Sequence, residues 1–419
     1  MPLGLPLLAA VTLVVQSTQA PPAQAQLLQA LQANRLPLTM SDGRPAGPGW
    51  DWLVREAGNA RFTLIGEEHG VAETAQLAAA LFAALRASGY SRVAIELSPP
   101  IAQDIEAAAR RNGGGGGVQG IEEFLKTPGI FTFYNMHEEV QFLADVVAAG
   151  PSNERVLWGF DREIFSDRYL ISKLEPKVPT SARAAFGRLK AASDSARAKN
   201  ARTGNPDDLF FLSQDSALAS ALRAAWPNPD PESDAAMRTL EASLAIETVE
   251  RTGGAWPYMQ RRAQWGRSNL AALLRADQGR AASPKILMKF GYNHMIRGAN
   301  YFNFFDIGTM ADEVAALTGE RAFHILVLPG PGSRQAVLGG AGFGSALSDS
   351  VDELRAGDQR LTRVLSNPNA TGHEVFDLRP LRALAMRGLE SWNADVVRTI
   401  HGYDAVVIWN GAHASTGLK

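Results

Sequence analysis

Short apolar runs rich in β-branched residues recur along the chain, and longer amphipathic stretches separate them. Between residues 73 and 86, Leu77, Leu81, Phe82 and Leu85 recur at the spacing of one helix face. A second helix is expected over residues 140–148. The apolar runs predict buried strands at residues 62–65, 92–95, 155–160, 285–292, 323–328 and 405–409. Strands that alternate with helices in this way indicate an α/β fold with a mainly parallel sheet flanked by helices.

The alternation stops between about residues 165 and 280, where helical patterns continue with almost no strand signal. We interpret this segment as a helical insertion packed over the end of the sheet that carries the candidate site described below. Together with the insertion, the strands and helices are expected to form one α/β domain over residues 26–419.

The first 25 residues have the pattern of a secretory signal peptide. An apolar run from Leu5 to Val15 is followed by small and polar residues that end in Ala23-Gln24-Ala25. The run is shorter than the roughly 20 apolar residues that a membrane-spanning helix needs. No Lys or Arg precedes it, so a buried N-terminal helix is the alternative. The pattern predicts export to the periplasm or out of the cell, with no membrane span.

Composition narrows the chemistry that the chain can carry. Of its 419 residues, 46% are hydrophobic and 20% are charged, which is enough for a large buried core. The formal net charge of −2 argues against a nucleic-acid partner, because phosphate binding requires a basic surface. The absence of cysteine excludes disulfides, thiolate metal ligands and a cysteine nucleophile. The expected partner is therefore a small-molecule substrate.

Titratable residues follow several of the predicted strands. Glu67, Glu68 and His69 come directly after the first strand, in LIGEEHG, and Glu96 ends the second strand, in VAIELSPP. Asp161 follows the third strand. Because the carboxyl ends of parallel strands form the ligand-binding edge of an open α/β sheet, we expect these groups to face one crevice. The alternative interpretation of Glu67, Glu68 and His69 is a charged turn exposed to solvent. The alternative interpretation of Glu96 is a residue that caps the following turn.

Two further histidine segments extend this pattern. His294 ends the strand in KFGYNHMIRG with Arg297 close behind it, while His137 and Glu139 begin a predicted helix. The alternative for His294 is a structural role, with its hydrogen bonds made inside the core. The alternative for Glu139 is capping of the helix N-terminus. The sequence has no serine nucleophile motif and no H-E-x-x-H motif. The candidate machinery is therefore histidine and carboxylate acting on water, with or without a metal.

Four motifs, in this order, resemble those of the erythromycin esterase-like family: LIGEEHG, VAIE, GFD and GYNHMIRG. The helix that carries Arg262 and, seven residues on, Asn269 is also similar, as is the terminal YDAVVIWN. The resemblance covers roughly residues 50–415. It implies a hydrolase of esters or lactones that needs no cofactor.

The resemblance also implies roles for individual residues. His69 would be the general base that activates water, and Glu67 and Glu96 would orient its ring. His294, aided by Arg297, would stabilise the oxyanion. The residues expected to bind the substrate are Glu68, Glu139, Asp161, Arg262 and Arg297.

Two other functions are consistent with the sequence. Only Glu68 separates Glu67 from His69, a spacing similar to that of a wider superfamily with metal-dependent Tiki-type proteases and haem-binding ChaN-like proteins. One alternative is therefore a metal-dependent hydrolase that holds a divalent ion on Glu67, His69, Glu96 and His294. The other is a non-catalytic haem-binding protein with His294 or a tyrosine as axial ligand. Its pocket would be lined by Trp256, Tyr258 and Trp265, for which core packing is the competing interpretation.

Overall fold

The computed structural model describes residues 22–111, 115–130, 132–277, 283–336, 351–354, 372–387 and 393–418. Its strands are β1 (Arg35–Ser41), β2 (Arg44–Ala46), β3 (Phe62–Glu67), β4 (Tyr90–Ile95), β5 (Leu157–Gly159), β6 (Lys285–Gly291), β7 (Ala322–Pro329), β8 (Gly332–Gln335), β9 (Val351–Leu354), β10 (His373–Asp377) and β11 (Ala405–Trp409). All the predicted strands are present, with small shifts at their ends. The predicted signal peptide falls mostly in residues 1–21, which lie outside the described residues.

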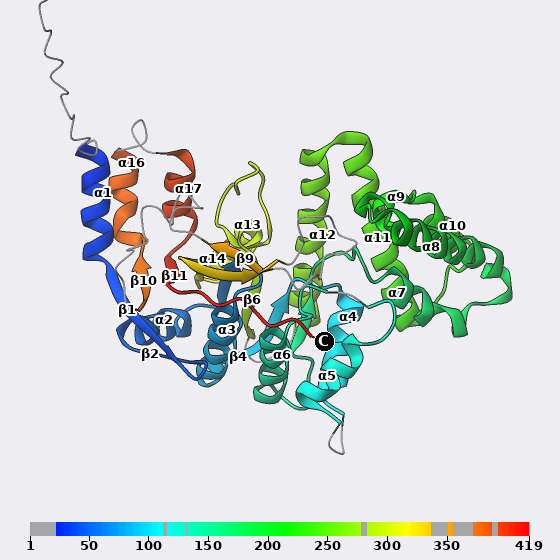
Figure 1. The fold of residues 1–419 in the computed structure, drawn as a ribbon, viewed down its shortest axis with the longest axis horizontal. Helices are drawn as coiled ribbons and strands as arrows, with labels where there is room; N and C mark the ends of the chain where they lie inside the picture. The colour runs from blue at the N-terminus through cyan, green and yellow to red at the C-terminus, as the bar shows by residue number, and fades with distance from the viewer. Residues whose placement is uncertain are drawn as a thin grey trace, which may run out of the picture.

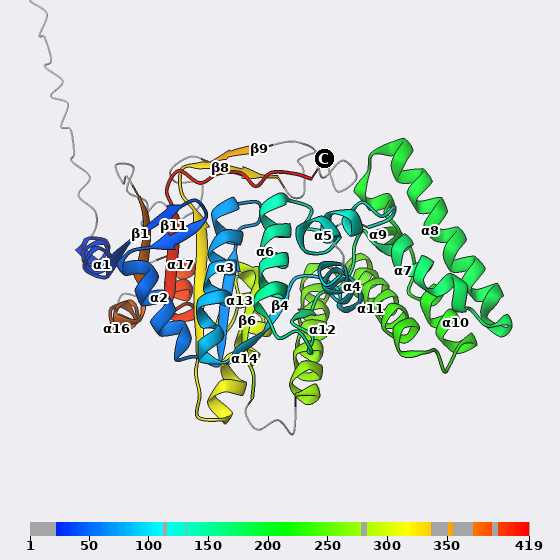
Figure 2. The ribbon, with the colours of Figure 1, turned by 90° about the horizontal axis from the view of Figure 1, so that it is seen from below.

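Nine strands form one mixed sheet in the order β2-β1-β10-β11-β7-β3-β6-β4-β5. The strands from β11 to β5 are parallel, whereas β2, β1 and β10 add an antiparallel edge (Figure 1). The α/β fold class with a mainly parallel sheet is therefore confirmed. A separate two-stranded pair, β8 and β9, lies along one edge of the molecule (Figure 2).

Helices cover both faces of the sheet, as parallel strands buried on both sides require. The helices are α1 (Pro22–Ala33), α2 (Pro48–Gly58), α3 (Ala72–Leu85), α4 (Pro99–Ala109), α5 (Gly117–Leu125), α6 (His137–Ala149), α7 (Asp167–Leu174), α8 (Arg183–Thr203), α9 (Phe210–Ser213), α10 (Ala217–Ala225), α11 (Pro231–Gly253), α12 (Ala255–Ala276), α13 (Tyr292–Met295), α14 (Ile307–Leu317), α16 (Arg382–Arg387) and α17 (Ala394–Gly402). On one face, a hydrophobic core lies between the sheet and the helices α2, α3 and α6. On the opposite face, α12 and α14 pack near its middle, and α1, α16 and α17 pack near the antiparallel edge.

The segment from about residue 165 to 280 is helical, as expected, but only part of it packs at the end of the sheet that carries the site. Helices α7 to α11 surround a hydrophobic core of their own and lie beyond the edge formed by β4 and β5 (Figures 1 and 2). Helix α12 instead returns to the sheet, where Leu270 and Leu273 pack against strand residues such as Met288. This return matters for function because α12 delivers Arg262 to the carboxyl ends of the strands.

The C-terminal segment runs along the rim above the helices α3 and α6 (Figure 2). The backbone N–H of Ser415 donates to the carbonyl of Gly70, and the N–H of His137 donates to the carbonyl of Thr416. Both bonded positions lie beside the candidate site, since Gly70 follows His69 and His137 begins the helix of Glu139. The segment therefore fixes two of the loops that carry the site.

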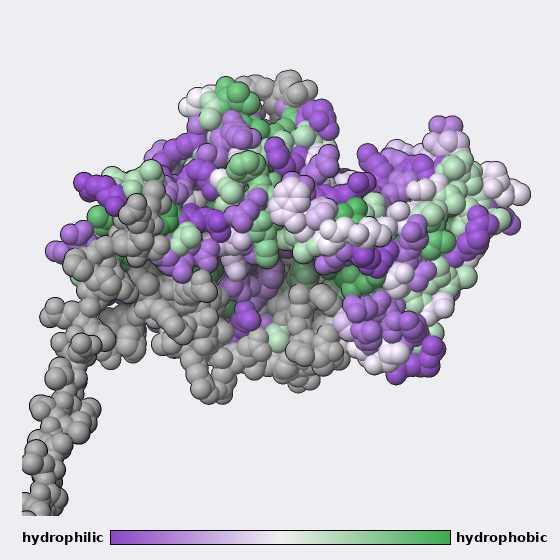
Figure 3. Space-filling view, turned by 90° about the horizontal axis from the view of Figure 1, so that it is seen from above, coloured by the Kyte–Doolittle hydropathy of each residue, from purple (hydrophilic) through white to green (hydrophobic). Residues whose placement is uncertain are grey.

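The surface in the view of Figure 3 mixes hydrophilic and hydrophobic residues, and its apolar areas are small and separate. The large apolar side chains that are exposed among the described residues are Trp256, Phe302, Phe305, Leu317 and Met386. No helix in the described parts of the chain combines the length and apolar character of a membrane span.

Candidate active site

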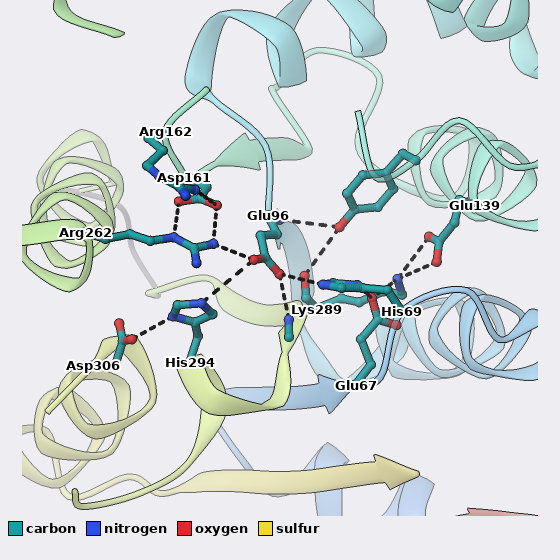
Figure 4. A network of polar contacts seen from close by, with 12 residues as sticks. Glu67, His69, Glu96, Glu139, Asp161, Arg162, Arg262, Lys289, His294 and Asp306 are labelled. Atoms are coloured by element: carbon teal, nitrogen blue, oxygen red, sulfur yellow. Dashed lines mark hydrogen bonds and ion pairs between the residues drawn. The ribbon is translucent and has the colours of Figure 1, made fainter. Parts of the chain in front are cut away.

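Four of the residues expected at strand exits, Glu67, Glu96, Asp161 and His294, meet at the carboxyl edge of the sheet (Figure 4). The cause is the strand order, because β3, β6 and β4 are adjacent and parallel. Glu67 is the last residue of β3 and pairs in register with Gly291, the last residue of β6. The convergence predicted from the sequence is therefore present in the structure.

Glu96 lies at the centre of the cluster and contacts both histidines. Its Oε2 atom lies 3.4 Å from Nε2 of His69, and its Oε1 atom lies 3.8 Å from Nε2 of His294. Oε1 also accepts a 2.6 Å hydrogen bond from Nη2 of Arg262, and Oε2 accepts a 2.7 Å bond from the backbone N–H of Gly291. Although burial raises the pKa of Glu96, the His69 hydrogen bond and the charges of His69 and Arg262 keep it well below its ordinary value. Glu96 is thus a carboxylate held between two imidazoles.

Strand β6 ends at Gly291, beside Glu96 and the two histidines. A Cβ atom there would lie 3.4 Å from Oε2 of Glu96, 3.4 Å from Nε2 of His69 and 3.9 Å from Cδ2 of His294. A side chain at this position would point into the space that the three groups share. The glycine therefore leaves that space open beside the backbone N–H that holds Glu96.

His69 is held between two carboxylates. Its Nδ1 atom lies 2.9 Å from Oε1 of Glu67, and its ring stacks on Phe133 with the ring centroids 5.3 Å apart. Burial lowers the pKa of His69, but its hydrogen bonds to Glu67 and Glu96 outweigh burial and raise it to about 10. His69 therefore carries a proton on both ring nitrogens near neutral pH.

His294 has a different partner. Its Nδ1 atom lies 2.7 Å from Oδ2 of Asp306, and Oδ1 of Asp306 accepts from the backbone N–H of Ile307 at the start of α14. Asp306 is almost fully buried, so its position is fixed. With Nδ1–H donated to Asp306, Nε2 of His294 is the nitrogen that faces Glu96 and can accept a proton. Asp306 is a site residue that the sequence interpretation missed.

Arg262 joins α12 to the cluster. Its guanidinium makes two hydrogen bonds to Asp161, of 3.0 Å and 2.5 Å, and one to Glu96. Although burial raises the pKa of Asp161, the charges of Arg262 and Arg162 keep it below its ordinary value. The planar guanidinium fixes both carboxylates through charge-assisted bonds. Asn269, on the same helix, donates to the carbonyl of Phe160 and ties α12 to the exit of β5.

A buried lysine, Lys289, is the second residue that the sequence interpretation missed. Its Nζ atom donates to Oε1 of Glu67 at 2.8 Å and to both carboxyl oxygens of Glu139, at 2.8 and 3.0 Å. Burial raises the pKa of Glu139 to about 7, because Lys289 offsets only part of this effect and the charge of Glu67 adds to it. Lys289 and Glu139 thus support Glu67 from the buried side. A lysine within the apolar strand LMKFG was the available signal, since a charge there requires a partner.

Two residues expected to bind substrate lie outside this network. The guanidinium of Arg297 pairs with Asp404 and Asp312, each at 3.0 Å, so it does not assist His294. The carboxylate of Glu68 pairs with Arg334 at 2.7 Å.

The candidate His137 also lies outside the network, because its side chain is half-exposed and pairs with Glu122 at 3.1 Å. Proximity in sequence did not predict these orientations, because neighbouring side chains leave a turn in different directions.

A small pocket opens beside Glu96. The space within it is only about 20 Å³, room for about one water molecule, and it lies between the loop that carries Phe133 and the segment from Asp161 to Phe165. The Phe133 and Phe165 rings meet edge to face with centroids 6.4 Å apart. Phe133 is therefore both a wall of the pocket and the ring stacked on His69.

The metal alternative does not fit these residues. Within the described ranges, no group of three or more His, Asp or Glu side chains is placed to hold a metal ion. Fixed cations already lie against both central carboxylates, Lys289 on Glu67 and Arg262 on Glu96. A divalent ion would meet this positive charge at short range. We therefore derive no step through a metal.

The aromatic residues considered for a haem pocket do not share one. Nε1 of Trp265 donates to the carbonyl of Asp161, the Tyr258 hydroxyl bonds to Arg162, and Trp256 is 53% exposed. Two of these rings are therefore held by hydrogen bonds to the segment after β5, and the third is largely exposed to solvent. These bonds support the interpretation of Tyr258 and Trp265 as structural residues.

The sequence matches no protein-family profile, and no curated protein matches it. Solved structures do share the fold. A succinoglycan biosynthesis protein matches with a TM-score of 0.64 at 13% identity, over 96% of this chain and 100% of that one. A Bacillus cereus protein matches with a TM-score of 0.57 at 14% identity, over 95% and 100% of the two chains. A point mutant of the erythromycin esterase EreC, in its open conformation, matches with a TM-score of 0.57 at 13% identity, over 92% and 99%. The chain therefore has the fold of erythromycin esterase EreC and of this succinoglycan biosynthesis protein.

Proposed function

We propose that this protein is a hydrolase that cleaves a carboxylic ester or lactone with water activated by histidine. The observation that carries the proposal is the meeting of two imidazoles at one carboxylate, with Nε2 of His69 3.4 Å and Nε2 of His294 3.8 Å from Glu96. Histidine and carboxylate side chains that act together are the ordinary means of moving a proton from water. The fold shared with erythromycin esterase EreC supports the same class of reaction.

The environments of the two histidines favour different roles. Glu67 and Glu96 hold His69 as a cation, which is a poor base but a good partner for negative charge that develops on a carbonyl oxygen. Asp306 holds Nδ1 of His294 and leaves Nε2 to accept a proton, the arrangement of a carboxylate–histidine dyad. We therefore assign the base to His294 and the oxyanion partner to His69, the reverse of the assignment that the family resemblance implied.

The reaction then proceeds without a cofactor. Nε2 of His294 removes a proton from water, and the resulting hydroxide attacks the carbonyl carbon. The Nε2–H of His69 turns from Glu96, to which its contact is long at 3.4 Å, towards the oxyanion. The carbon–oxygen bond to the leaving group breaks, and His294 returns its proton to the alkoxide. The products are a carboxylic acid and an alcohol, and Asp306 and Glu96 stabilise the transient His294 cation.

A panel of esters and lactones tests this proposal. Wild-type protein is assayed with and without a chelator, beside the His69→Ala and His294→Ala variants. His137→Ala is the matched control, because His137 lies on the same rim but its side chain pairs with Glu122, outside the network. Turnover should survive the chelator and the control substitution and should fall on the order of 10²–10³-fold in the other two variants. Wild-type rates in both variants on every ester that is hydrolysed would refute the proposal.

The N-terminal pattern described above supports a second, independent part of the proposal, which is export to the periplasm or out of the cell. Export would be tested by fractionating cells that express the full chain, with mass spectrometry of the mature N-terminus. Cleavage after Ala25 is the expected result.

A further inference from the structure

The short helix α13 carries His294, so the position of this one turn decides where the imidazole lies. A single helical turn is not stable by itself, because it makes too few backbone hydrogen bonds to offset the cost of ordering the chain. The carbonyl groups at the C-terminus of a helix also need partners from outside it. Contacts with the rest of the fold must therefore hold α13, and with it His294, in place.

Two buried side chains bond to the carbonyls at the two ends of α13. At its first residue, the hydroxyl of Tyr403 donates to the carbonyl of Tyr292. At its last residue, Nδ1 of His324 donates to the carbonyl of Met295 at 2.7 Å. The side chains of Tyr403 and His324 are both completely buried, so their surroundings fix each donor. Both ends of the turn that carries His294 are thus tied to other parts of the fold.

The two donors are themselves joined through Asp404. The backbone N–H of His324 donates to Oδ2 of Asp404 at 2.9 Å, and the carbonyl of His324 accepts from the backbone N–H of Asp404 at 2.8 Å. Because Asp404 directly follows Tyr403, the pairing of β7 with this segment sets the spacing between the two donors. The donors therefore form a frame that does not depend on α13.

Glycines let the neighbouring elements come close to both ends of α13. A Cβ atom at Gly66, on β3, would lie 2.7 Å from the Tyr403 hydroxyl and 2.9 Å from Cα of Tyr292. A Cβ atom at Gly308, on α14, would lie 2.8 Å from the carbonyl oxygen of Met295. These distances are too short for a stable contact, so a larger residue at either position would displace α13.

We propose that Tyr403 and His324 are positioning residues for His294, because they hold the two ends of the turn that directs its Nε2 atom towards Glu96. Both act through the backbone of α13 and not on the substrate. The kinetic part of this inference rests on the proposed hydrolysis, in which His294 is the base. The placement of His294 does not, and it can be measured without a substrate.

The kinetic test is Tyr403→Phe, which removes one hydroxyl and keeps the ring. With the best substrate of the ester and lactone panel, kcat should fall about 10- to 100-fold with little change in KM, because a small displacement of the base slows the chemical step. Tyr301→Phe is the matched control. The Tyr301 ring packs edge to face on Tyr292 with centroids 5.5 Å apart, but its hydroxyl bonds to Thr399 on α17. This variant should keep the wild-type kcat.

A double variant tests whether the effect passes through His294. In the His294→Ala background, Tyr403→Phe should lower the residual rate no further, because the group that it positions is already absent. An equal loss in the wild-type and His294→Ala backgrounds would show a general structural effect and would overturn the inference.

Proton NMR measures the placement of His294 directly. Its Nδ1–H, bonded to Asp306, should give a downfield resonance that is absent in His294→Ala. Tyr403→Phe and His324→Leu should shift or broaden this resonance, and Tyr301→Phe should leave it unchanged. His324→Asn, whose amide can donate near the place of Nδ1, should preserve more of it than His324→Leu does.

This measurement separates failure of the positioning from failure of the hydrolase. If the resonance changes as expected but no ester or lactone is hydrolysed, the positioning is supported and the proposed function fails. If folded Tyr403→Phe and His324→Leu both give the wild-type resonance, the inference fails regardless of activity.

Discussion

Nδ1 of His294 lies 2.7 Å from Oδ2 of Asp306, on the side of the ring that faces away from Glu96. His69 repeats this arrangement with Glu67, at 2.9 Å. Each imidazole is thus held by one carboxylate while its second nitrogen faces a shared one, Glu96. The carboxylates that hold the two imidazoles differ in their own partners. Glu67 is also bonded to Lys289, whereas Asp306 caps helix α14.

Asp306→Asn is expected to lower kcat on the order of 10²–10⁴-fold with little change in KM. An amide can hold the ring in the wrong tautomer and cannot stabilise the cation that His294 becomes. Steady-state kinetics over a range of pH checks this, with Asp312→Asn as the control, since Asp312 pairs with Arg297 outside the network. A purely structural role for Asp306 would instead change the unfolding midpoint and leave kcat of the folded fraction unaltered.

The stability of the wild-type protein should decrease with rising pH in a way that depends on His69. The folded-state pKa of about 10 exceeds the ordinary value of 6.5, so folded protein keeps a proton that the unfolded chain loses. This contribution to the free energy of unfolding is complete below pH 6.5 and is lost as pH rises towards 10, by about 1.4 kcal/mol per pH unit.

Urea unfolding at pH 7 and pH 9, of wild type and His69→Gln, measures this contribution. Wild type should lose about 2–3 kcal/mol more than the variant between the two pH values. Equal losses would show that His69 does not hold its proton as the structure indicates.

Lys289→Met should destabilise the fold by about 3–5 kcal/mol, because it leaves Glu67 and Glu139 buried without their cation. Adding Glu139→Gln should recover part of this loss, since Glu67 retains His69 as a partner. Chemical denaturation of the single and double variants gives the comparison. Additive losses in the double variant would contradict a shared ion-pair network.

Exhaustive chelation should leave the hydrolytic rate unchanged. Lys289 and Arg262 occupy positions against the central carboxylates where a metal would have to bind. The rate is measured after dialysis against a chelator and after addition of Mn²⁺ or Zn²⁺. Loss on chelation followed by recovery with one metal would contradict the ion pairing described here.

The sequence predicted the parallel part of the sheet well and the antiparallel edge not at all. Strand β11 is a continuous apolar run and β3 begins as one, and both are buried along their whole length, which is the pattern of strands covered on both faces. By contrast, β1 is mostly exposed and contains Pro37, and β10 is short with polar ends. Such edge strands owe their structure to pairing with distant residues, here 35–38 with 373–376, and not to a local pattern.

In the candidate site too, the residues that a local sequence pattern marks were predicted, and those that long-range contacts bring in were not. His69, Glu96 and Asp161 could be found because each follows a strand whose end has a known place in the fold. Asp306 could not, since it lies twelve residues beyond His294, in a loop with no periodic pattern, and reaches it only in the folded chain. Arg297 was expected in the site from its position near His294, but Asp404 and Asp312 hold it elsewhere.

The most direct test of the central claim is the rate at which wild type, His69→Ala, His294→Ala and Glu96→Gln hydrolyse the best substrate of the ester and lactone panel in the presence of a chelator. Circular dichroism of each protein confirms that it is folded. Wild type should turn the substrate over, and each folded variant should lose activity on the order of 10²-fold or more. A folded Glu96→Gln protein with wild-type kcat would contradict it, because the two histidines would then act without the carboxylate that joins them.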